Sequence, residues 1–173
     1  TQHRYADPEG FHSYAERDEW EICVHRQVPV SVEQAWEAWF TSIWEGQPQP
    51  VMLDPGEGRS RLGSVRTVPR LRMTERIVSV GLPAGPPADD AVPSISYTVE
   101  HFSASSYLGY VRFLPTGARS DNTQILWCVK WTPSLAGRVL FLGGHVLARM
   151  LTSAIQQALD TLEQEATHGT GTT

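Results

Sequence analysis

Three residues in the middle of the chain, Glu75, Tyr97 and His101, carry side chains that can move protons. A carboxylate enclosed by apolar side chains has a raised pKa and can act as a general acid or base near neutral pH. A phenol or an imidazole can hold a carbonyl oxygen or relay a proton. These residue types therefore allow acid–base chemistry on a carbonyl compound. The alternative is structural, with Glu75 facing solvent beside Arg76 or another arginine and the two rings packing against their neighbours.

Two tryptophans offer a surface for aromatic ligands. The clearest strand pattern, over residues 123–133, places Trp127 and Trp131 in one uninterrupted apolar row. Two indoles on one face can form a platform for an aromatic or polycyclic molecule. The alternative is ordinary core packing of both rings against a helix.

Six arginines gather in a short stretch of the chain. They predict either a cationic strip for an anionic partner, such as an acyl carrier protein, or the solvated face of two paired strands. The six residues are Arg59, Arg61, Arg66, Arg70, Arg72 and Arg76.

Composition excludes several other classes of function. The 173 residues, 40 % hydrophobic and 19 % charged, have the size and composition of one globular domain. The net charge of −5 argues against a general nucleic-acid or membrane-surface protein, and no apolar run is long enough to span a bilayer. The histidines have no metal-ligand spacing, and the sequence has no glycine-rich nucleotide loop and no nucleophile elbow. We therefore expect neither a metal nor a cofactor.

The two cysteines, Cys23 and Cys128, lie in strand-like runs without ligand spacing. We expect two buried free thiols in a reducing cytosol, with a single disulfide as the alternative. The first twenty residues are polar and lack the apolar core of a signal peptide, so the expected location is cytoplasmic.

The elements that carry these residues follow from hydrophobic periodicity and capping signals. A half-buried strand is predicted over residues 19–28, and a helix begins at Ser31, which has capping-box spacing with Gln34. Trp36 and Phe40 lie on the apolar face of that helix. Further strands are predicted over residues 64–69, 71–82, 95–100, 107–115 and 123–133.

A long helix over residues 137–166 is predicted to close the chain, with Leu147, Leu151 and Ile155 on its apolar face. A sheet followed by such a helix is an α+β arrangement, and the proline-rich residues 83–93 are a linker within it. The predicted division is a flexible N-terminal arm over residues 1–18, one domain over 19–166 and a disordered tail over 167–173.

Three segments resemble the START-like superfamily, which also contains the Bet v 1 proteins and the polyketide aromatase/cyclases. Residues 28–36, VPVSVEQAW, are similar to the exit from that family's first strand. Residues 123–133, TQILWCVKWTP, are similar to its last strand, and the long final helix is the third feature. The resemblance implies a helix-grip fold, in which a curved antiparallel sheet wraps around the C-terminal helix and leaves an apolar cavity between them.

The resemblance also implies that the ligand is a hydrophobic, polycyclic or polyketide-like small molecule. Trp36 and Phe40 are expected to close one end of the cavity. The residues expected on its wall are Glu75, Ile77, Ser79, Tyr97, Trp127, Trp131, Leu147, Leu151 and Ile155.

Three functions are compatible with this fold. The first is a cofactor-free aromatase/cyclase, in which Glu75, Tyr97 or His101 handles protons during aldol closure and dehydration. The second is a carrier or a sequestering protein for self-resistance against a hydrophobic natural product. The third is a protein-interaction module like the Hsp90-activator relatives. Binding ranks ahead of catalysis, because residues 71–82 lack the combination of an aromatic residue and an arginine associated with aromatase/cyclases.

Overall fold

The computed structural model describes residues 20–46, 49–83, 92–100, 104–116, 121–140 and 145–169. Within this part of the chain, seven strands form one antiparallel sheet in the order β1-β7-β6-β5-β4-β3-β2. The strands are β1 (Trp20–Val28), β2 (Val51–Asp54), β3 (Val65–Val68), β4 (Met73–Gly81), β5 (Ser94–Glu100), β6 (Ala104–Thr116) and β7 (Asn122–Pro133). The sequence pattern predicted all of these strands except β2, a short exposed strand at the sheet edge.

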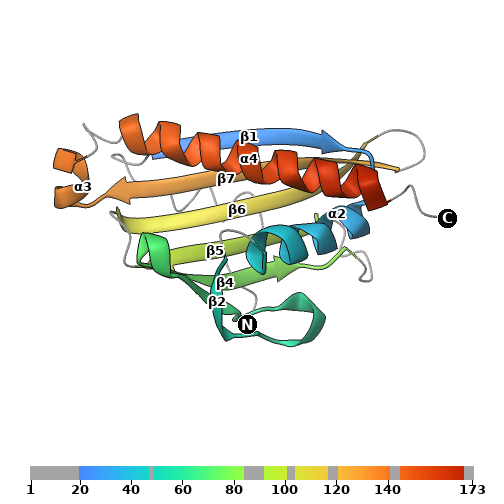
Figure 1. Ribbon diagram of the computed structural model, residues 1–173, viewed down its shortest axis with the longest axis horizontal. Helices are drawn as coiled ribbons and strands as arrows, with labels where there is room; N and C mark the ends of the chain where they lie inside the picture. The colour runs from blue at the N-terminus through green and yellow to red at the C-terminus, as the bar shows by residue number, and fades with distance from the viewer. Residues whose placement is uncertain are drawn as a thin grey trace.

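Helices α2 (Val32–Ala38) and α4 (His145–Gly169) lie on the same face of this sheet, with α4 lying along β1 and β7 (Figure 1). The predicted α+β helix-grip fold is confirmed. The helices are α2 (Val32–Ala38), the π-helix η1 (Trp39–Trp44), the short 3-10 helices η2 (Gly58–Ser60) and η3 (Pro69–Leu71), α3 (Leu135–Leu140) and α4 (His145–Gly169).

The start of α2 follows the predicted capping box. The Ser31 hydroxyl accepts a hydrogen bond from the Gln34 amide at 3.3 Å, and the Gln34 side chain accepts one from the Ser31 amide at 3.1 Å. These two bonds satisfy backbone donors that the first turn of a helix leaves unpaired. The apolar residues that follow α2 form η1. The backbone carbonyl groups at the end of η1 lie against the sheet.

The predicted closing helix is two helices in the structure. Figure 1 shows α3 as a short separate helix beyond the end of β7. Residues 141–144, which the prediction placed inside one continuous helix, lie outside the described residues, as do residues 1–19 and 170–173. Helix α4 is tied to β1 by ion pairs from Arg26 to Asp160 and Glu163. No helix of the described segments is long and apolar enough to cross a membrane.

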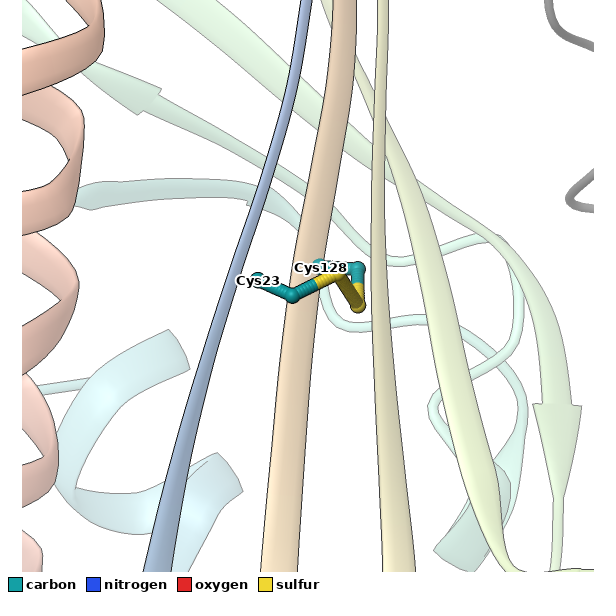
Figure 2. The surroundings of a disulfide bond; sticks show 2 residues. All are labelled: Cys23 and Cys128. Carbon is teal, nitrogen blue, oxygen red and sulfur yellow. A yellow bond between two sulfur atoms is a disulfide. The ribbon is translucent and has the colours of Figure 1, made fainter.

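The prediction of two free thiols is wrong, because Cys23 and Cys128 form a disulfide. They are direct partners in the register of β1 and β7, with their Cα atoms 4.1 Å apart. Figure 2 shows the bond linking β1 to β7, with the sulfur atoms on the side of the sheet away from α4. Disulfides are rare in a reducing cytosol. The cytoplasmic location remains a prediction, and this bond argues against it.

Candidate functional site

A cavity of about 370 Å³ lies between the sheet and α4. Leu151 and Ile155 of α4 form part of its apolar wall, together with Met73 and Val99 of the sheet. Cavities of this size, mostly apolar with a few polar groups, are typical of small-molecule sites. Its polar and aromatic wall residues include Arg66, Glu75, Tyr97, Tyr107 and Trp127.

A buried ion pair joins Arg66 and Glu75, which are direct partners in the register of β3 and β4. Their side chains are only 7 % and 6 % exposed. The guanidinium Nη1 also donates to the carbonyl oxygens of Ile43 and Trp44 at the end of η1. The same guanidinium lies 4.4 Å from the centroid of the Trp44 ring. These contacts offset the hydration that the Arg66 guanidinium loses on burial.

Tyr97 projects its phenol from β5 into the same cavity. The indole Nε1 of Trp127 donates a hydrogen bond to the Tyr97 hydroxyl at 3.0 Å, and the Tyr107 hydroxyl is also hydrogen-bonded to it. Burial is the main cause that raises the pKa of Tyr97 above its ordinary value, and the charge of Glu75 adds to it. Burial likewise raises the pKa of Tyr107. Both phenols therefore stay protonated at neutral pH and act as hydrogen-bond donors, not as bases.

The room for the Tyr97 ring comes from a glycine. Gly109 is the partner of Tyr97 on β6, and a β carbon at this position would lie 2.1 Å from Cζ of Tyr97. A glycine inside a strand commonly marks such a close approach. Behind the ring, Trp39 packs with its centroid 6.2 Å from Tyr97 and 5.6 Å from Trp127. The phenol is therefore held from several sides.

Five of the predicted residues lie on the cavity wall: Glu75, Tyr97, Trp127, Leu151 and Ile155. Their roles in binding or catalysis stay predictions. His101 lies outside the described residues.

Other predicted wall residues belong to the packed core. The prediction treated cavity wall and core as one surface, but the inner side of the sheet extends well past the cavity. Trp131 is fully buried against neighbouring side chains, as are the two aromatic residues expected to close one end. Of the predicted site residues, those that belong to the core cluster and do not line the cavity are Trp36, Phe40, Ile77, Trp131 and Leu147.

Ser79 does not line the cavity, because a β-bulge changes the side of the sheet that it faces. Simple alternation along β4 would place Ser79 on the same side as Glu75 and Ile77. The register shifts between Ile77 and Ser79, so that Ser79 pairs with Ser96 of β5. Ser96 alternates with Tyr97 and therefore faces away from the cavity. Sequence periodicity does not reveal the extra residue.

The arginine cluster does not form one strip. Arg59 pairs with Glu33 and Glu37, and its guanidinium lies 5.6 Å from the centroid of the Trp36 ring. Arg61 pairs in the same way with Glu37 and Glu45 and lies over the Phe40 ring. Arg66 is buried, and Arg70, Arg72 and Arg76 are exposed. An acyl carrier protein as partner stays a prediction.

Arg66, Tyr107 and Gly109 are site residues that the sequence analysis missed. Arg66 of β3 meets Trp44 of η1 only in the folded chain, so no pattern along a single strand indicates this contact. The one sequence signal for these contacts was the glycine within the apolar run of β6. Glycine weakens a strand, so its presence there indicates a close approach of another group to the backbone. In the described part of the chain, no group of three His, Cys, Asp or Glu side chains could hold a metal ion.

Comparisons with known proteins identify solved structures with a similar fold. No protein-family model and no curated protein matches the sequence. Among solved structures, norcoclaurine synthase from Thalictrum flavum matches with a TM-score of 0.60 and 11 % identity, over 88 % of this chain and 97 % of that one. Ara h 8.0201 matches with a TM-score of 0.60 and 14 % identity, over 87 % and 99 % of the two chains. The di-domain ARO/CYC StfQ of the steffimycin biosynthetic pathway matches with a TM-score of 0.61 and 16 % identity, over 94 % of this chain and 55 % of that one.

These likenesses establish a Bet v 1-like helix-grip fold, as the sequence resemblance implied. The chain spans about half of StfQ, which has two domains. Identities this low show the fold alone, because the same fold can support unrelated functions.

Proposed function

We propose that this protein binds a hydrophobic small molecule with an aromatic ring system in the cavity between the sheet and α4. The observation that carries this proposal is the cavity of about 370 Å³, which combines an apolar helix wall with Tyr97 and Trp127 on the sheet side. An aromatic ligand would pack against the Trp127 indole, and its polar atom would accept a hydrogen bond from the Tyr97 hydroxyl. The similarly folded norcoclaurine synthase has been solved in complex with dopamine and hydroxybenzaldehyde.

The test is a fluorescence titration with N-phenyl-1-naphthylamine, an uncharged aromatic probe, supported by native mass spectrometry of the purified protein. We expect saturable binding. Leu151→Trp fills the cavity and should weaken binding by about tenfold or more, since a well-packed cavity has no room for both groups. Met150→Trp is the matched control, because Met150 is 56 % exposed on the neighbouring position of α4 and does not line the cavity.

The control should bind like the wild type. If the folded wild-type protein binds neither this probe nor any member of a panel of polycyclic aromatics, lipids and sterols, the proposal is wrong. Equal loss of affinity in both tryptophan variants would mean that the probe binds elsewhere on α4.

A second candidate function is cofactor-free ring closure of a poly-ketone, because the cavity holds a carboxylate and a protonated phenol together. Glu75 would take a proton from a carbon between two carbonyl groups, and the enolate oxygen would accept a hydrogen bond from Tyr97. The enolate carbon would then attack a second carbonyl of the same molecule. Glu75 would return the proton to the new alkoxide, and loss of water would complete the dehydration.

This candidate differs from a carrier or a self-resistance protein in one measurable way. Glu75→Gln should lower turnover of a poly-β-ketone thioester by roughly a hundredfold, the range of general-base effects, while the protein still binds N-phenyl-1-naphthylamine. Glu100→Gln, an exposed position on the same sheet, is the control. Binding without turnover in the wild type would favour the carrier. The protein-interaction module stays a prediction.

A further inference from the structure

We propose that the cavity selects uncharged ligands over carboxylates, and that Glu75 sets this selectivity. The inference rests on the proposed function, because it concerns the ligand of the same cavity. It concerns the charge of the ligand, whichever ring system the ligand carries.

The argument begins with the charges on the cavity wall. Among the described residues that line it, Arg66 and Glu75 are the two that carry a formal charge. They form an ion pair in which both side chains are almost fully buried. The described wall is therefore neutral overall, and its positive charge lies directly beside a negative one.

The Arg66 guanidinium is already engaged by the protein. Its Nε donates to Glu75, its Nη1 donates to the carbonyl oxygens of Ile43 and Trp44, and its Cζ lies over the Trp44 ring. A ligand carboxylate that approached Arg66 would have to displace Glu75 or be buried beside its negative charge. Either outcome leaves a buried anion without a counter-charge, which is strongly unfavourable.

The polar wall group that we assign to the ligand is a neutral donor. The Tyr97 hydroxyl stays protonated, because burial and the nearby Glu75 charge raise its pKa. A phenol can hydrogen-bond to a ketone, aldehyde or hydroxyl oxygen, but it does not neutralise a carboxylate. The wall thus suits an aromatic ligand with an uncharged oxygen acceptor.

Two probes with the same ring system test this inference on the full chain at pH 7.5. The first, 2-acetylnaphthalene, carries an uncharged ketone, and the second, 2-naphthoate, carries a carboxylate. We expect the wild type to bind the ketone at least about tenfold more tightly, since burying an unpaired charge weakens binding by this much or more. This comparison needs no variant and therefore does not depend on how a variant folds.

Glu75→Gln then tests the role assigned to Glu75. Without the Glu75 charge, Arg66 becomes available to a ligand, so the affinity for 2-naphthoate should rise by about tenfold or more while that for the ketone changes little. Glu100→Gln removes one negative charge from an exposed position and is the matched control for net charge. It should leave the preference of the wild type intact.

The outcomes separate this inference from the proposed function. Equal affinities of the wild type for the two probes would overturn the selectivity and leave the binding function standing. Binding of neither probe would overturn this inference, and the titration with N-phenyl-1-naphthylamine and the wider panel decides separately whether the binding function stands. A selective wild type whose preference is unchanged in a folded Glu75→Gln protein would remove Glu75 as its cause.

Discussion

The ring of Tyr97 lies directly over the backbone of Gly109, its cross-strand partner. A β carbon on Gly109 would lie 2.1 Å from Cζ and 2.6 Å from the hydroxyl oxygen of Tyr97, and real β carbons essentially never come within 3.0 Å. This close approach lets the hydroxyl reach the Trp127 indole, whose Nε1 lies 3.0 Å away. The absence of a side chain on β6 therefore positions a polar group of the cavity.

Gly109→Ala should displace the Tyr97 ring and destabilise the protein by about 1–3 kcal/mol, the range for overpacking a buried site. The measurement is urea unfolding, with N-phenyl-1-naphthylamine affinity as the second readout. In a Tyr97→Ala background the same change at Gly109 meets no ring, so most of its effect should disappear. An effect of equal size in both backgrounds would show that Tyr97 is not what requires the glycine.

Arg66→Met should destabilise the protein by about 3–5 kcal/mol, because it leaves the Glu75 carboxylate buried without its partner. Chemical unfolding measures this change. The double variant Arg66→Met with Glu75→Met removes both charges and should recover much of the stability, since a buried pair replaced by apolar groups is often close to neutral. A single variant as stable as the wild type would contradict the ion pair.

Reduction of the disulfide should lower the unfolding free energy by about 2–5 kcal/mol, the usual range for a native disulfide. The two cysteines are separated by 105 residues, and bonds that close long loops restrict the unfolded chain most. The Cys23→Ser, Cys128→Ser protein should behave like the reduced one. Because the sulfur atoms lie on the side of the sheet away from α4, probe affinity should remain unchanged (Figure 2). Loss of affinity on reduction would contradict this separation.

Stability should fall as the pH rises above about 10, the ordinary pKa of tyrosine. Burial raises the pKa of Tyr97 and Tyr107 in the folded protein, so the unfolded chain releases these protons first. Their contribution is thus fully present below pH 10 and is lost as pH climbs toward the folded-state values. Unfolding titrations from pH 8 to 12 measure the slope, with phenolate absorbance recorded in parallel. Tyr97→Phe should reduce the slope, and ionisation of every tyrosine near pH 10 without unfolding would refute the prediction.

Residues whose partners are close in the sequence were predictable. Ser31 and Gln34 are three positions apart, so the capping box follows from helix geometry alone. The alternation in β7 likewise indicated that Trp127 faces inward, and the wall positions of Leu151 and Ile155 follow from helical periodicity.

Relationships that depend on strand register were not predictable. In the sequence, Arg66 belongs to a cluster of arginines expected at the surface. The pairing of β3 with β4 places it opposite Glu75. The bulge after Ile77 turns Ser79 to the other side of the sheet, and the register of β1 and β7 brings Cys23 to Cys128. A shift of one residue in any of these pairings would change which side chains meet.

The sequence by itself determined most of the strands and helices and the apolar faces that enclose the cavity, and its resemblance to the START-like superfamily implied the helix-grip fold. The elements and their apolar faces follow from local periodicity and capping, because they depend on backbone geometry within a few residues. Only the tertiary structure decided which polar groups meet in the cavity. Arg66, Glu75, Tyr97 and Gly109 come from four different strands, and their contacts exist only when the strands pair in one register.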